Sequence, residues 1–475
     1  MDANIKTKRY KNLFSDTIAF AVSNFASKIL VFLLVPLYTS VLSTNDYGIA
    51  DLVTNTVNLL YPILTLSIME ATLRYSFDSN IAKDEVLLNS LIVIIIAEGV
   101  LICITPITKS YIGELQEYWI WLLIIFFGFN LQQVLSQFVK GIGNTKIFAK
   151  SGIVQTLVVV ISNIIGLLIL NGGLKAYLLS IALGYYITVC YLIFASKIKL
   201  KKFTLNPGLF KEMVLLYSIP MIPTLVSWWV STSADKYVII AYLGIAASGI
   251  YSVAYKIPSV LNLLTNIFTS AWMISAIQSI SDEDSEVYQS NVYKYFNAVN
   301  VLVCTILIIF SQILGKILFA KEFYEAWHCV PFLLVAYVFA GLSGFLASSF
   351  RAEKNTKGLV GSSLAGGITN IILNIVCIPF LGIMGAAFTT LIGFAVTFFL
   401  RLISLKKIMN INVESKKNNF SYFVLVIQAF VMGNEFRGHY IISCVLLVLI
   451  IYIYIDVYRV IVGKLVSLLK NRKRF

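Results

Sequence analysis

The segment that decides the fold class is VLLNSLIVIIIAEGVLICITPI, residues 86–107, which carries a single charged side chain, Glu98. A helix needs about 20 mostly apolar residues to cross a hydrocarbon core about 30 Å thick. Segments of this kind recur along the chain and predict an all-α membrane protein of about fourteen transmembrane helices. Their expected bounds are 14–39, 49–73, 86–107, 119–139, 153–170, 176–195, 213–243, 249–276, 296–314, 330–350, 359–380, 385–403, 420–431 and 441–462. The thirteenth is short enough to be re-entrant or interfacial instead.

The composition supports the membrane assignment, since 59% of the 475 residues are hydrophobic and only 13% are charged. That leaves too little polar surface for a soluble protein of this length. The net charge of +14 does not indicate nucleic-acid binding, because the cations lie in short loops that favour an anionic lipid surface. The first apolar segment follows a basic start but is too long for a cleaved signal peptide, so we expect it to remain as an anchor.

The distribution of lysine and arginine predicts the orientation in the membrane. With a cytoplasmic N-terminus, the inner loops, tails and adjoining span ends hold 29 of the 37 cations, and the outer loops hold 5. The remaining 3 are Lys28, Lys236 and Lys256, inside expected spans. This bias matches the positive-inside rule and requires an even number of spans, because the C-terminal tail is itself basic. We therefore expect a cytoplasmic (inner) membrane protein with both termini in the cytoplasm.

Cysteine and histidine give no sign of metal or redox chemistry. The six cysteines are scattered without paired spacing, and there are only two histidines, His328 and His439. Metal and haem centres need clustered ligands of these types. The sequence predicts no cofactor and no metal site.

Two internal repeats predict that the chain consists of two related halves. The first repeat has a spacing of 211 positions: Lys140, Asn144, Thr145, Lys146 and Asn163 recur as Arg351, Asn355, Thr356, Lys357 and Asn374. The second has a spacing of 201 positions: Leu42, Gly48, Ile49 and Leu60 recur as Leu243, Gly249, Ile250 and Leu261. An even number of spans separates the copies, so the halves are expected to be parallel repeats, as in one class of secondary transporter. The duplicated turns predict a cytoplasmic gate formed by Asn144, Lys146, Arg351, Asn355 and Lys357.

Polar stripes and prolines occupy matching spans of the two halves. Asp51, Asn55, Asn58 and Thr65 share one helical face, and the residues 201 positions later are Ser252, Lys256, Ser259 and Asn266. Polar groups facing lipid are costly, so both stripes are expected to face a shared wet interior. Kinks are expected at Pro36, Pro62, Pro220, Pro223 and Pro258. Interrupted spans in matching positions indicate a transport site, although prolines are in any case frequent in membrane helices.

Three intramembrane lysines suggest an anionic substrate. Lys28, Lys236 and Lys256 would each cost about 2.5 to 3.5 kcal/mol at a helix centre, so lipid exposure is unfavourable. Three ammonium groups facing one cavity would suit phosphate or pyrophosphate. The alternatives are snorkelling towards an interface or, for Lys236, a local pair with Asp235.

Three carboxylates are candidates for coupling transport to a cation. Glu70 and Arg74, spaced i and i+4, would form either the inner mouth of the cavity or an ordinary interfacial ion pair. Glu98 is the most isolated acid in the membrane, and a lone acid there can carry a proton or cation. Asp235 is the third candidate, beside Lys236.

Several short motifs resemble one known family. They are Lys28, PLYT at 36–39, YGIAD at 47–51, EATLR at 70–74, Asp235-Lys236, GIYSVAYK at 249–256 and GIMGAA at 382–387. Together the segments resemble polysaccharide repeat-unit flippases of the O-antigen (Wzx) type, in the multidrug, oligosaccharidyl-lipid and polysaccharide exporter superfamily. Each motif is short, but the resemblance covers most of the chain.

The resemblance implies a MATE-like fold of two pseudo-symmetric six-helix lobes, at 1–200 and 201–408, followed by two extra helices and a basic tail at 409–475. It also implies a substrate, an undecaprenyl-pyrophosphate-linked oligosaccharide, moved to the outer leaflet by alternating access in antiport with H⁺ or Na⁺. The implied substrate cavity consists of Lys28, Asn55, Asn58, Arg74, Lys236, Lys256 and Ser259. Membrane lipid and the polysaccharide polymerase machinery are the implied partners.

Three alternatives remain open from the sequence. A peptidoglycan lipid-precursor flippase would share the fold, the extra helices and a cationic cavity. A multidrug exporter of the same superfamily would favour acidic and aromatic linings without buried lysines. A membrane glycosyltransferase or polymerase is disfavoured, because the loops are short and catalytic residues usually lie on loops. We therefore expect a transporter rather than an enzyme.

Overall fold

The structure is a computed structural model that describes residues 29, 30, 32–108, 116–198, 206–279, 284–353 and 357–472. Throughout these ranges the ordered elements are helices, and no strand occurs in them, so the predicted all-α class is confirmed. Lys28 and Asn355, two expected site residues, lie outside the described residues, as does most of the first expected span. The chain forms two compact units, Met1–Ser233 (unit 1) and Ala234–Phe475 (unit 2).

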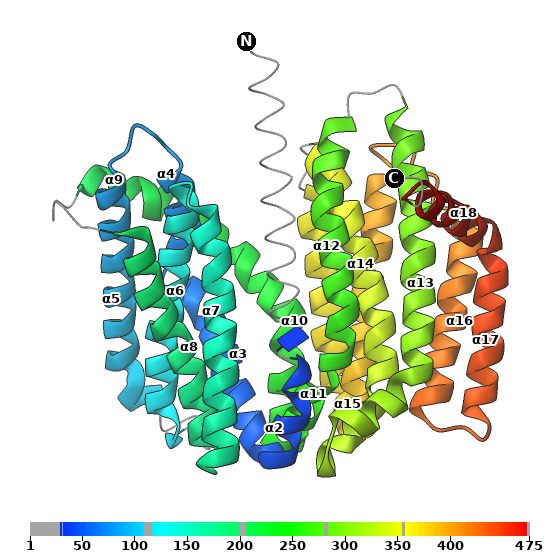
Figure 1. Ribbon diagram of the computed structural model, residues 1–475, viewed down its shortest axis with the longest axis horizontal. Coiled ribbons are helices and arrows are strands. Elements are labelled where there is room, and N and C mark those ends of the chain that lie inside the picture. Colours follow the sequence, from blue (N-terminus) through cyan, green and yellow to red (C-terminus); the bar gives the residue numbers. More distant parts are fainter. Residues whose placement is uncertain are drawn as a thin grey trace. The chain divides into compact units, whose positions relative to one another are not determined.

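Unit 1 contains the first expected spans and the start of α10 (Figure 1). Its helices are α2 (Val35–Val41), α3 (Thr44–Leu64), α4 (Ile68–Ser76), α5 (Lys83–Thr108), α6 (Trp119–Gly141), α7 (Thr145–Asn163), η2 (Ile164–Ile169), α8 (Gly173–Ser196), α9 (Pro207–Lys211), η3 (Glu212–Ser218) and η4 (Ile219–Met221). α10 (Ile222–Leu243) continues without a break from unit 1 into unit 2. The six-helix lobes at 1–200 and 201–408 stay predictions.

Unit 2 contains the rest of α10 and the helices that follow it (Figure 1). They are α11 (Ile245–Ala254), α12 (Lys256–Ser279), α13 (Ser285–Leu318), η5 (Lys321–His328), α14 (Val330–Ala352), α15 (Lys357–Leu405), α16 (Ser415–Gly433), α17 (His439–Ile453) and α18 (Ile455–Arg472). α14 lies at the centre of the unit and packs against α12, α13, α15 and α16.

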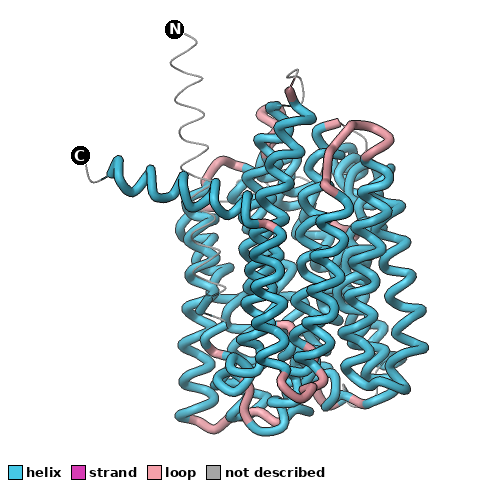
Figure 2. Tube along the Cα trace, turned by 90° about the vertical axis from the view of Figure 1, so that its right-hand side faces the viewer, coloured by secondary structure: helices cyan, strands magenta, loops and turns pink. Residues whose placement is uncertain are grey.

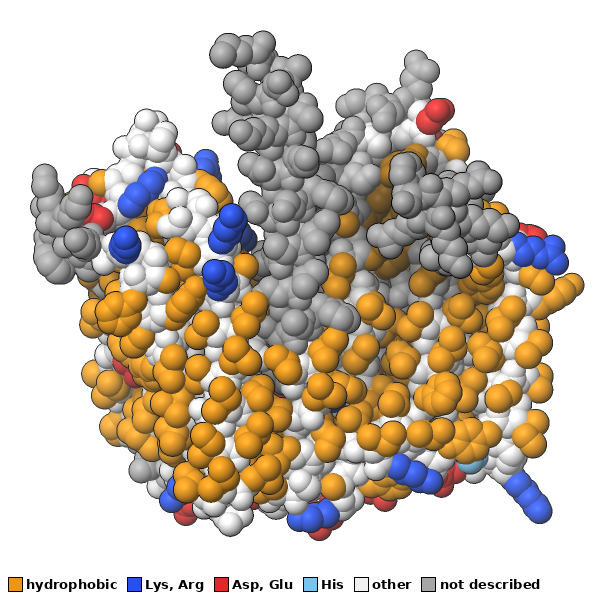
Figure 3. All heavy atoms as spheres, in the orientation of Figure 1, with side chains coloured by type: hydrophobic (Ala, Val, Ile, Leu, Met, Phe, Trp, Pro, Cys, Tyr) orange, Lys and Arg blue, Asp and Glu red, His pale blue; other side chains and the backbone are white. Residues whose placement is uncertain are grey.

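The surface has the pattern of a multi-pass membrane protein. On each unit, exposed apolar side chains cover the flanks of the helices, and charged side chains gather near the helix ends (Figure 3). Nine helices in the described ranges are long and apolar enough to span a membrane, or eleven if each of two bent pairs counts as one span. The predicted number of fourteen therefore stays a prediction, since α15 alone covers two of the expected spans and the first lies mostly outside the described residues.

The expected span at 49–73 is broken in the middle, as the position of Pro62 predicts. α3 and α4 meet at an angle of 64°, and Leu66 and Ser67 between them have left-handed backbone conformations. Proline has no N–H to donate to the preceding turn, so the helix is weakened there. The Ser67 hydroxyl donates to the Pro62 carbonyl (3.2 Å), which satisfies one backbone group at the break.

Other proline-bearing spans are interrupted too. Before α10, the chain forms the π-helix η3 and the 3₁₀ turn η4, which contains Pro220. In the expected span at 249–276, α11 ends at Ala254 and α12 begins at Lys256, with Pro258 in its first turn. These local changes of helix type allow freed backbone groups to find new partners within the membrane.

α15 consists of two arms joined by a sharp kink at Gly382, whose φ of 60° is accessible to glycine without strain. The arms approach each other closely at Gly366 and Gly393. A Cβ on Gly366 would overlap the Thr397 hydroxyl, and one on Gly393 would lie 2.9 Å from the Asn370 Cβ. Glycine at these two positions therefore lets the arms pack side by side, which sets the spacing of polar groups described below.

The end of the chain differs from the expectation. The expected thirteenth span is part of a continuous 19-residue helix, α16, which packs on α13, α14 and α17; that it crosses the membrane stays a prediction. The expected span at 441–462 is bent rather than straight, because α17 stops at Ile453 and α18 leaves it at an angle of 72°. Continuing straight would carry Asp456 and Arg459 into the hydrocarbon, which is costly.

Candidate functional site

The most elaborate polar site in the described residues surrounds Asp235, on the part of α10 that belongs to unit 2. Asp235 is only 3% exposed. Its Oδ2 accepts hydrogen bonds from the hydroxyls of Tyr251 (2.8 Å), Tyr255 (2.8 Å) and Thr390 (3.4 Å). Its Oδ1 accepts from the Lys236 backbone N–H (2.9 Å). Four donors from α10, α11, the break after α11 and the second arm of α15 thus stabilise one buried carboxylate.

A chain of amide and hydroxyl groups extends the site across both arms of α15. The Asn370 amide donates to the Thr390 hydroxyl (3.5 Å), and the Asn374 amide donates to Asn370 Oδ1 (3.1 Å). The Thr389 hydroxyl donates to Asn374 Oδ1, which closes the chain. All four side chains are buried. We call Asp235, Tyr251, Tyr255, Asn370, Asn374, Thr389 and Thr390 the Asp235 cluster.

The cluster is rich in the oxygen atoms that small hard cations prefer. Carboxylate, amide and hydroxyl oxygens of the cluster come from three helices, and hydroxyl oxygens can accept as well as donate. The described residues include no group of three His, Cys, Asp or Glu side chains placed to hold a metal ion. Because the cation-binding atoms of the cluster are oxygens, the cluster fits H⁺ or Na⁺ better than a transition metal, whose usual ligands are histidine and cysteine.

Lys236, which follows Asp235 in the chain, also lies beside the ring of Tyr255. Its ammonium group lies 5.8 Å from the centroid of the Tyr255 ring, a cation–π arrangement. Tyr255 thus contacts both members of the sequence pair, one through its hydroxyl and the other through its ring. The expected site residues Asp235 and Lys236 are therefore brought together with Tyr255.

A second polar feature of unit 2 is the α12 polar face, which consists of Lys256, Ser259, Asn262, Asn266 and Ser270. These residues are spaced three or four apart, so they share one side of the helix. Ser259, Asn266 and Ser270 are exposed, although α12 is otherwise apolar and exposes leucine and phenylalanine on another side. Hydrogen bonds within the face link Asn266 to Asn262 (3.2 Å) and Ser270 to the Asn266 carbonyl (2.7 Å).

One end of this face reaches an expected gate residue. The Arg351 guanidinium, at the end of α14, lies 3.6 Å from the sulfur of Met273, three residues beyond Ser270 on α12. Arg351 is exposed. Lys256 at one end and Arg351 at the other thus place a cation at each end of the polar face, within unit 2.

In unit 1, the predicted stripe on α3 has contacts within its own helix and with α10. The Asn55 amide donates to the Asp51 side chain (2.8 Å), and the Trp229 indole of α10 donates to the Asn55 carbonyl (3.0 Å). Asn58 is half-buried one turn further along. The Trp229 contact fixes the first part of α10 to α3, in the same unit.

The other expected carboxylates are not gathered into one site. Glu70 and Arg74 lie on α4, and no ion pair joins them in the described part of the chain; the charge acting on Glu70 is that of Lys140 on α6. Glu98 lies on α5, and its Oε2 is buried without a hydrogen-bond partner among the described residues. The Tyr186 hydroxyl nearby donates to the Ile124 carbonyl instead.

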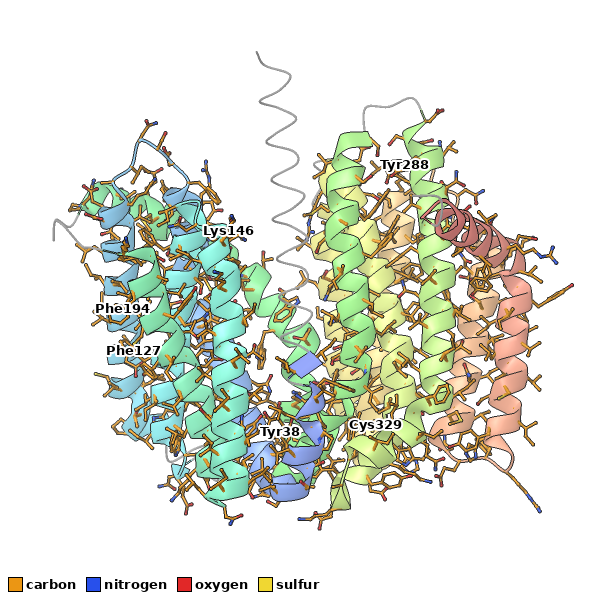
Figure 4. All side chains as sticks on the ribbon, in the orientation of Figure 1. Tyr38, Phe127, Lys146, Phe194, Tyr288 and Cys329 are labelled. Atoms are coloured by element: carbon orange, nitrogen blue, oxygen red, sulfur yellow. The ribbon has the colours of Figure 1, made fainter. Side chains whose placement is uncertain are left out.

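The expected gate residues that the structure describes lie at the ends of helices. Asn144 precedes α7 and Lys146 is the second residue of α7. Both are exposed, and Lys146 lies at one end of unit 1, with Tyr38 near the opposite end (Figure 4). Lys357 is the first residue of α15. Whether these helix ends meet during transport stays a prediction.

One cation at an inner span end is buried by neighbouring helices. Arg401, within the expected span at 385–403, is 7% exposed inside the second arm of α15. Its guanidinium donates to the Ser343 carbonyl (2.9 Å), Ser362 Oγ (3.2 Å) and Ser363 Oγ (2.7 Å). These acceptors join α14 and the first arm of α15 to the second arm. Packed helices thus supply the solvation that water would give in a loop.

The sequence analysis also missed most of the Asp235 cluster. Tyr251 and Tyr255 were quoted as part of a family motif, and Asn374 only as a repeated position. The missed signal is a set of polar residues at helical spacing inside apolar segments: Asn370 with Asn374 before the kink, and Thr389 with Thr390 after it. Only the fold of the two arms shows that these pairs face each other.

Comparison with known proteins places this geometry in context. Among solved structures, the lipid II flippase MurJ in an inward closed conformation has a TM-score of 0.67 at 16% identity and covers 94% of this chain and 100% of its own. An outward-facing multidrug resistance MATE transporter of the MOP superfamily has a TM-score of 0.59 at 16% identity and covers 82% of this chain and 93% of its own. A MOP superfamily transporter from Pyrococcus furiosus has a TM-score of 0.59 at 12% identity and covers 88% of this chain and 95% of its own. The MATE-like fold predicted from the sequence is therefore confirmed.

The sequence comparisons reach the family. An uncharacterised membrane protein of Methanocaldococcus jannaschii is 24% identical over 420 residues, which are 84% of this chain and 99% of that protein. The family model described as "Polysaccharide biosynthesis protein" matches residues 13–274, more than half of the chain. The apolar helices, the MOP-type fold and this match lead to one conclusion: the chain belongs to the polysaccharide biosynthesis protein family.

Proposed function

We propose that the protein is a flippase that moves an undecaprenyl-pyrophosphate-linked oligosaccharide repeat unit from the cytoplasmic to the outer leaflet, for O-antigen or capsule synthesis. The family assignment supports a role in polysaccharide biosynthesis, and the fold supports transport. The transported molecule combines a charged pyrophosphate, a polar sugar chain and an apolar tail. The path must therefore contain water for the sugar chain and positive charge for the pyrophosphate.

The observation that carries the proposal is the α12 polar face. Exposed serine and asparagine side chains in the middle of an apolar spanning helix would be costly against lipid. We therefore infer that this face lines a water-filled path. Lys256 begins the face and Arg351 lies at its far end, and both would attract the pyrophosphate as it moves. Serine and asparagine between them can exchange hydrogen bonds with sugar hydroxyls.

We infer that Asp235 couples transport to the movement of H⁺ or Na⁺. Its carboxylate is held by hydroxyls that can turn from donor to acceptor when a cation enters. The Asp235 cluster joins α10, α11 and both arms of α15, so a change in its charge would alter the packing of several helices at once. A bistable arrangement of that kind is what converts a local binding event into a larger motion.

The proposed cycle is alternating access by rocking of the two halves, with the duplicated turns as the cytoplasmic gate. α10 is suited to transmit the change, because Trp229 fixes its first part to α3 and Asp235 fixes its second part within unit 2. A cation at Asp235 would therefore act on a helix that belongs to both units.

The test is reconstitution of the full chain into liposomes with an imposed H⁺ or Na⁺ gradient. Three substrates are compared: an undecaprenyl-pyrophosphate-linked oligosaccharide, the lipid-linked peptidoglycan precursor and a cationic dye. Preferred flipping of the first, lost when the gradient is collapsed, is expected. Preferred flipping of the second or export of the third would replace the proposal with a peptidoglycan-precursor flippase or a multidrug exporter.

A further inference from the structure

The C-terminal helix α18 turns away from the bundle at Tyr454. α17 ends at Ile453, and α18 leaves it at 72°, so the two cannot form one straight span. Seen from the side, α18 runs outward from the spanning helices of unit 2 near one of their ends (Figure 2). This direction carries it into the region that lipid headgroups would occupy around unit 2.

The turn is held rigidly by buried hydrogen bonds. The Tyr454 hydroxyl donates to Asn418 Oδ1 of α16 (2.8 Å) and accepts from the Asn297 amide of α13 (2.9 Å). One turn into α18, Val457 is buried, and the Tyr458 hydroxyl donates to the Ala298 carbonyl (3.0 Å). The direction of α18 is therefore set by contacts to two spanning helices rather than by a flexible joint.

Between Arg459 and Gly463 most of the described side chains of α18 are exposed. Arg459, which directly follows Tyr458, is exposed. Val460 is 41% exposed and Val462 is 56% exposed. The sequence of α18, IDVYRVIVGKLVSLLKNR, is rich in apolar residues and contains four cations, Arg459, Lys464, Lys470 and Arg472, against one acid, Asp456. An apolar helix with an excess of lysine and arginine that leaves the spanning bundle is suited to a membrane interface.

We propose that α18 lies in the plane of the membrane interface and binds anionic phospholipid headgroups. The charge balance favours an anionic surface, and the exposed valines favour the boundary of the acyl chains rather than water. Each lysine or arginine near an anionic surface favours binding by about 1 kcal/mol, about fivefold. Because Tyr454 couples α18 to α13 and α16, the bound lipid would also hold these two helices at a fixed depth.

The experiment uses the full chain in nanodiscs of phosphatidylcholine alone or with three parts in ten of phosphatidylglycerol. Native cysteines are replaced, and a nitroxide is attached at V462C, because Val462 is the most exposed apolar residue described in α18. Accessibility of the nitroxide to oxygen and to a water-soluble nickel chelate reports its depth. Phosphatidylglycerol is expected to shift the label towards the oxygen-accessible, chelate-protected environment.

Charge variants make the test specific. The variant R459Q/K464Q/K470Q is expected to respond less to phosphatidylglycerol. For each cation removed, the ratio of label at the interface to label in water should fall by about fivefold. The matched control K316Q/K321Q/R437Q removes three exposed cations at the opposite end of unit 2 and should respond as the unmodified chain does. Three results would overturn the proposal. The label could be equally accessible in both lipid mixtures, it could be protected from both reagents as in a protein contact, or the control could lose the response equally.

Discussion

Two intramembrane carboxylates, Asp235 and Glu98, looked alike in sequence but lie in opposite kinds of environment. Asp235 receives four hydrogen bonds from several elements of unit 2. Glu98 is half-buried on α5, its Oε2 has no partner among the described residues, and the residues on either side include exposed isoleucines. The difference teaches that the position of a carboxylate within a span says little about its function. Hydrogen-bond donors that converge on it from several helices are the better indication of a site whose geometry is set in advance.

The comparison is tested most strongly by neutralising each acid. Asp235→Asn keeps the size of the side chain but removes the charge that four donors stabilise, so ion-coupled flipping should fall by at least about 100-fold. Glu98→Gln should change the rate by less than about threefold, since no prepared donors act on that carboxylate. Both are measured as initial flipping rates in proteoliposomes under an imposed cation gradient.

The reverse result would break the comparison. If Glu98→Gln stops flipping while Asp235→Asn retains it, unit 1 rather than unit 2 carries the coupling site. Flipping that continues in the double variant at the normal rate would show that neither acid couples transport. Protein yield and monodispersity of each variant separate these outcomes from loss of folding.

The next largest effect is expected at the lysines of unit 2. Lys256→Gln should weaken binding of a pyrophosphate-linked substrate by about tenfold, about 1.4 kcal/mol, because it removes a cation from the α12 polar face. Lys256→Arg keeps the charge and should retain more binding. Lys316→Gln, an exposed lysine in the last turn of α13 and outside the α12 polar face, is the control. Binding is measured by competition with inorganic pyrophosphate; equal loss in Gln and Arg variants would show that shape rather than charge matters.

A smaller effect is expected for the hydroxyls around Asp235. Tyr251→Phe and Tyr255→Phe each remove one donor to the buried carboxylate, at a cost of about 1 kcal/mol, which is about fivefold in apparent affinity for the coupling ion. Tyr337→Phe is the matched control, because its ring packs against Tyr255 but its hydroxyl is not among the donors to Asp235. The measurement is the ion concentration that gives half-maximal flipping. An equal shift in the Tyr337 variant would attribute the effect to packing.

The sequence predicted the features of the fold that depend on local pattern. The lengths of the apolar segments predicted the spanning helices, and Pro62 predicted an interruption in the segment that forms α3 and α4. The direction of α18 was missed, because it depends on the hydrogen bonds of Tyr454 to two distant helices. The burial of Arg401 was missed for the same reason: its solvation comes from α14 and both arms of α15, which are brought together only in the fold.

The candidate site could be predicted only in part. Asp235, Lys236 and Lys256 stand out in sequence because charges are rare in spanning helices. Tyr251, Thr390 and Asn370 do not, since single hydroxyls and amides are tolerated in apolar helices when they bond to the preceding turn. Their role depends on the kink at Gly382, which turns the second arm of α15 back so that Thr390 can reach Asp235.

The smallest effect is expected at the start of α7, where charge acts in water rather than in the membrane. Lys146→Gln should change the flipping rate by less than about twofold, because an exposed cation is screened beyond about 8 Å at physiological salt. The change should vanish at high salt, whereas the effects at Asp235 and Tyr251 should persist, since buried pairs are screened much less. Lys175→Gln, an exposed cation at the start of α8, is the matched control and should have no effect at any salt concentration. A large, salt-independent loss at Lys146 would contradict the comparison, because it would place a prepared site in unit 1 where the structure shows only an exposed helix end.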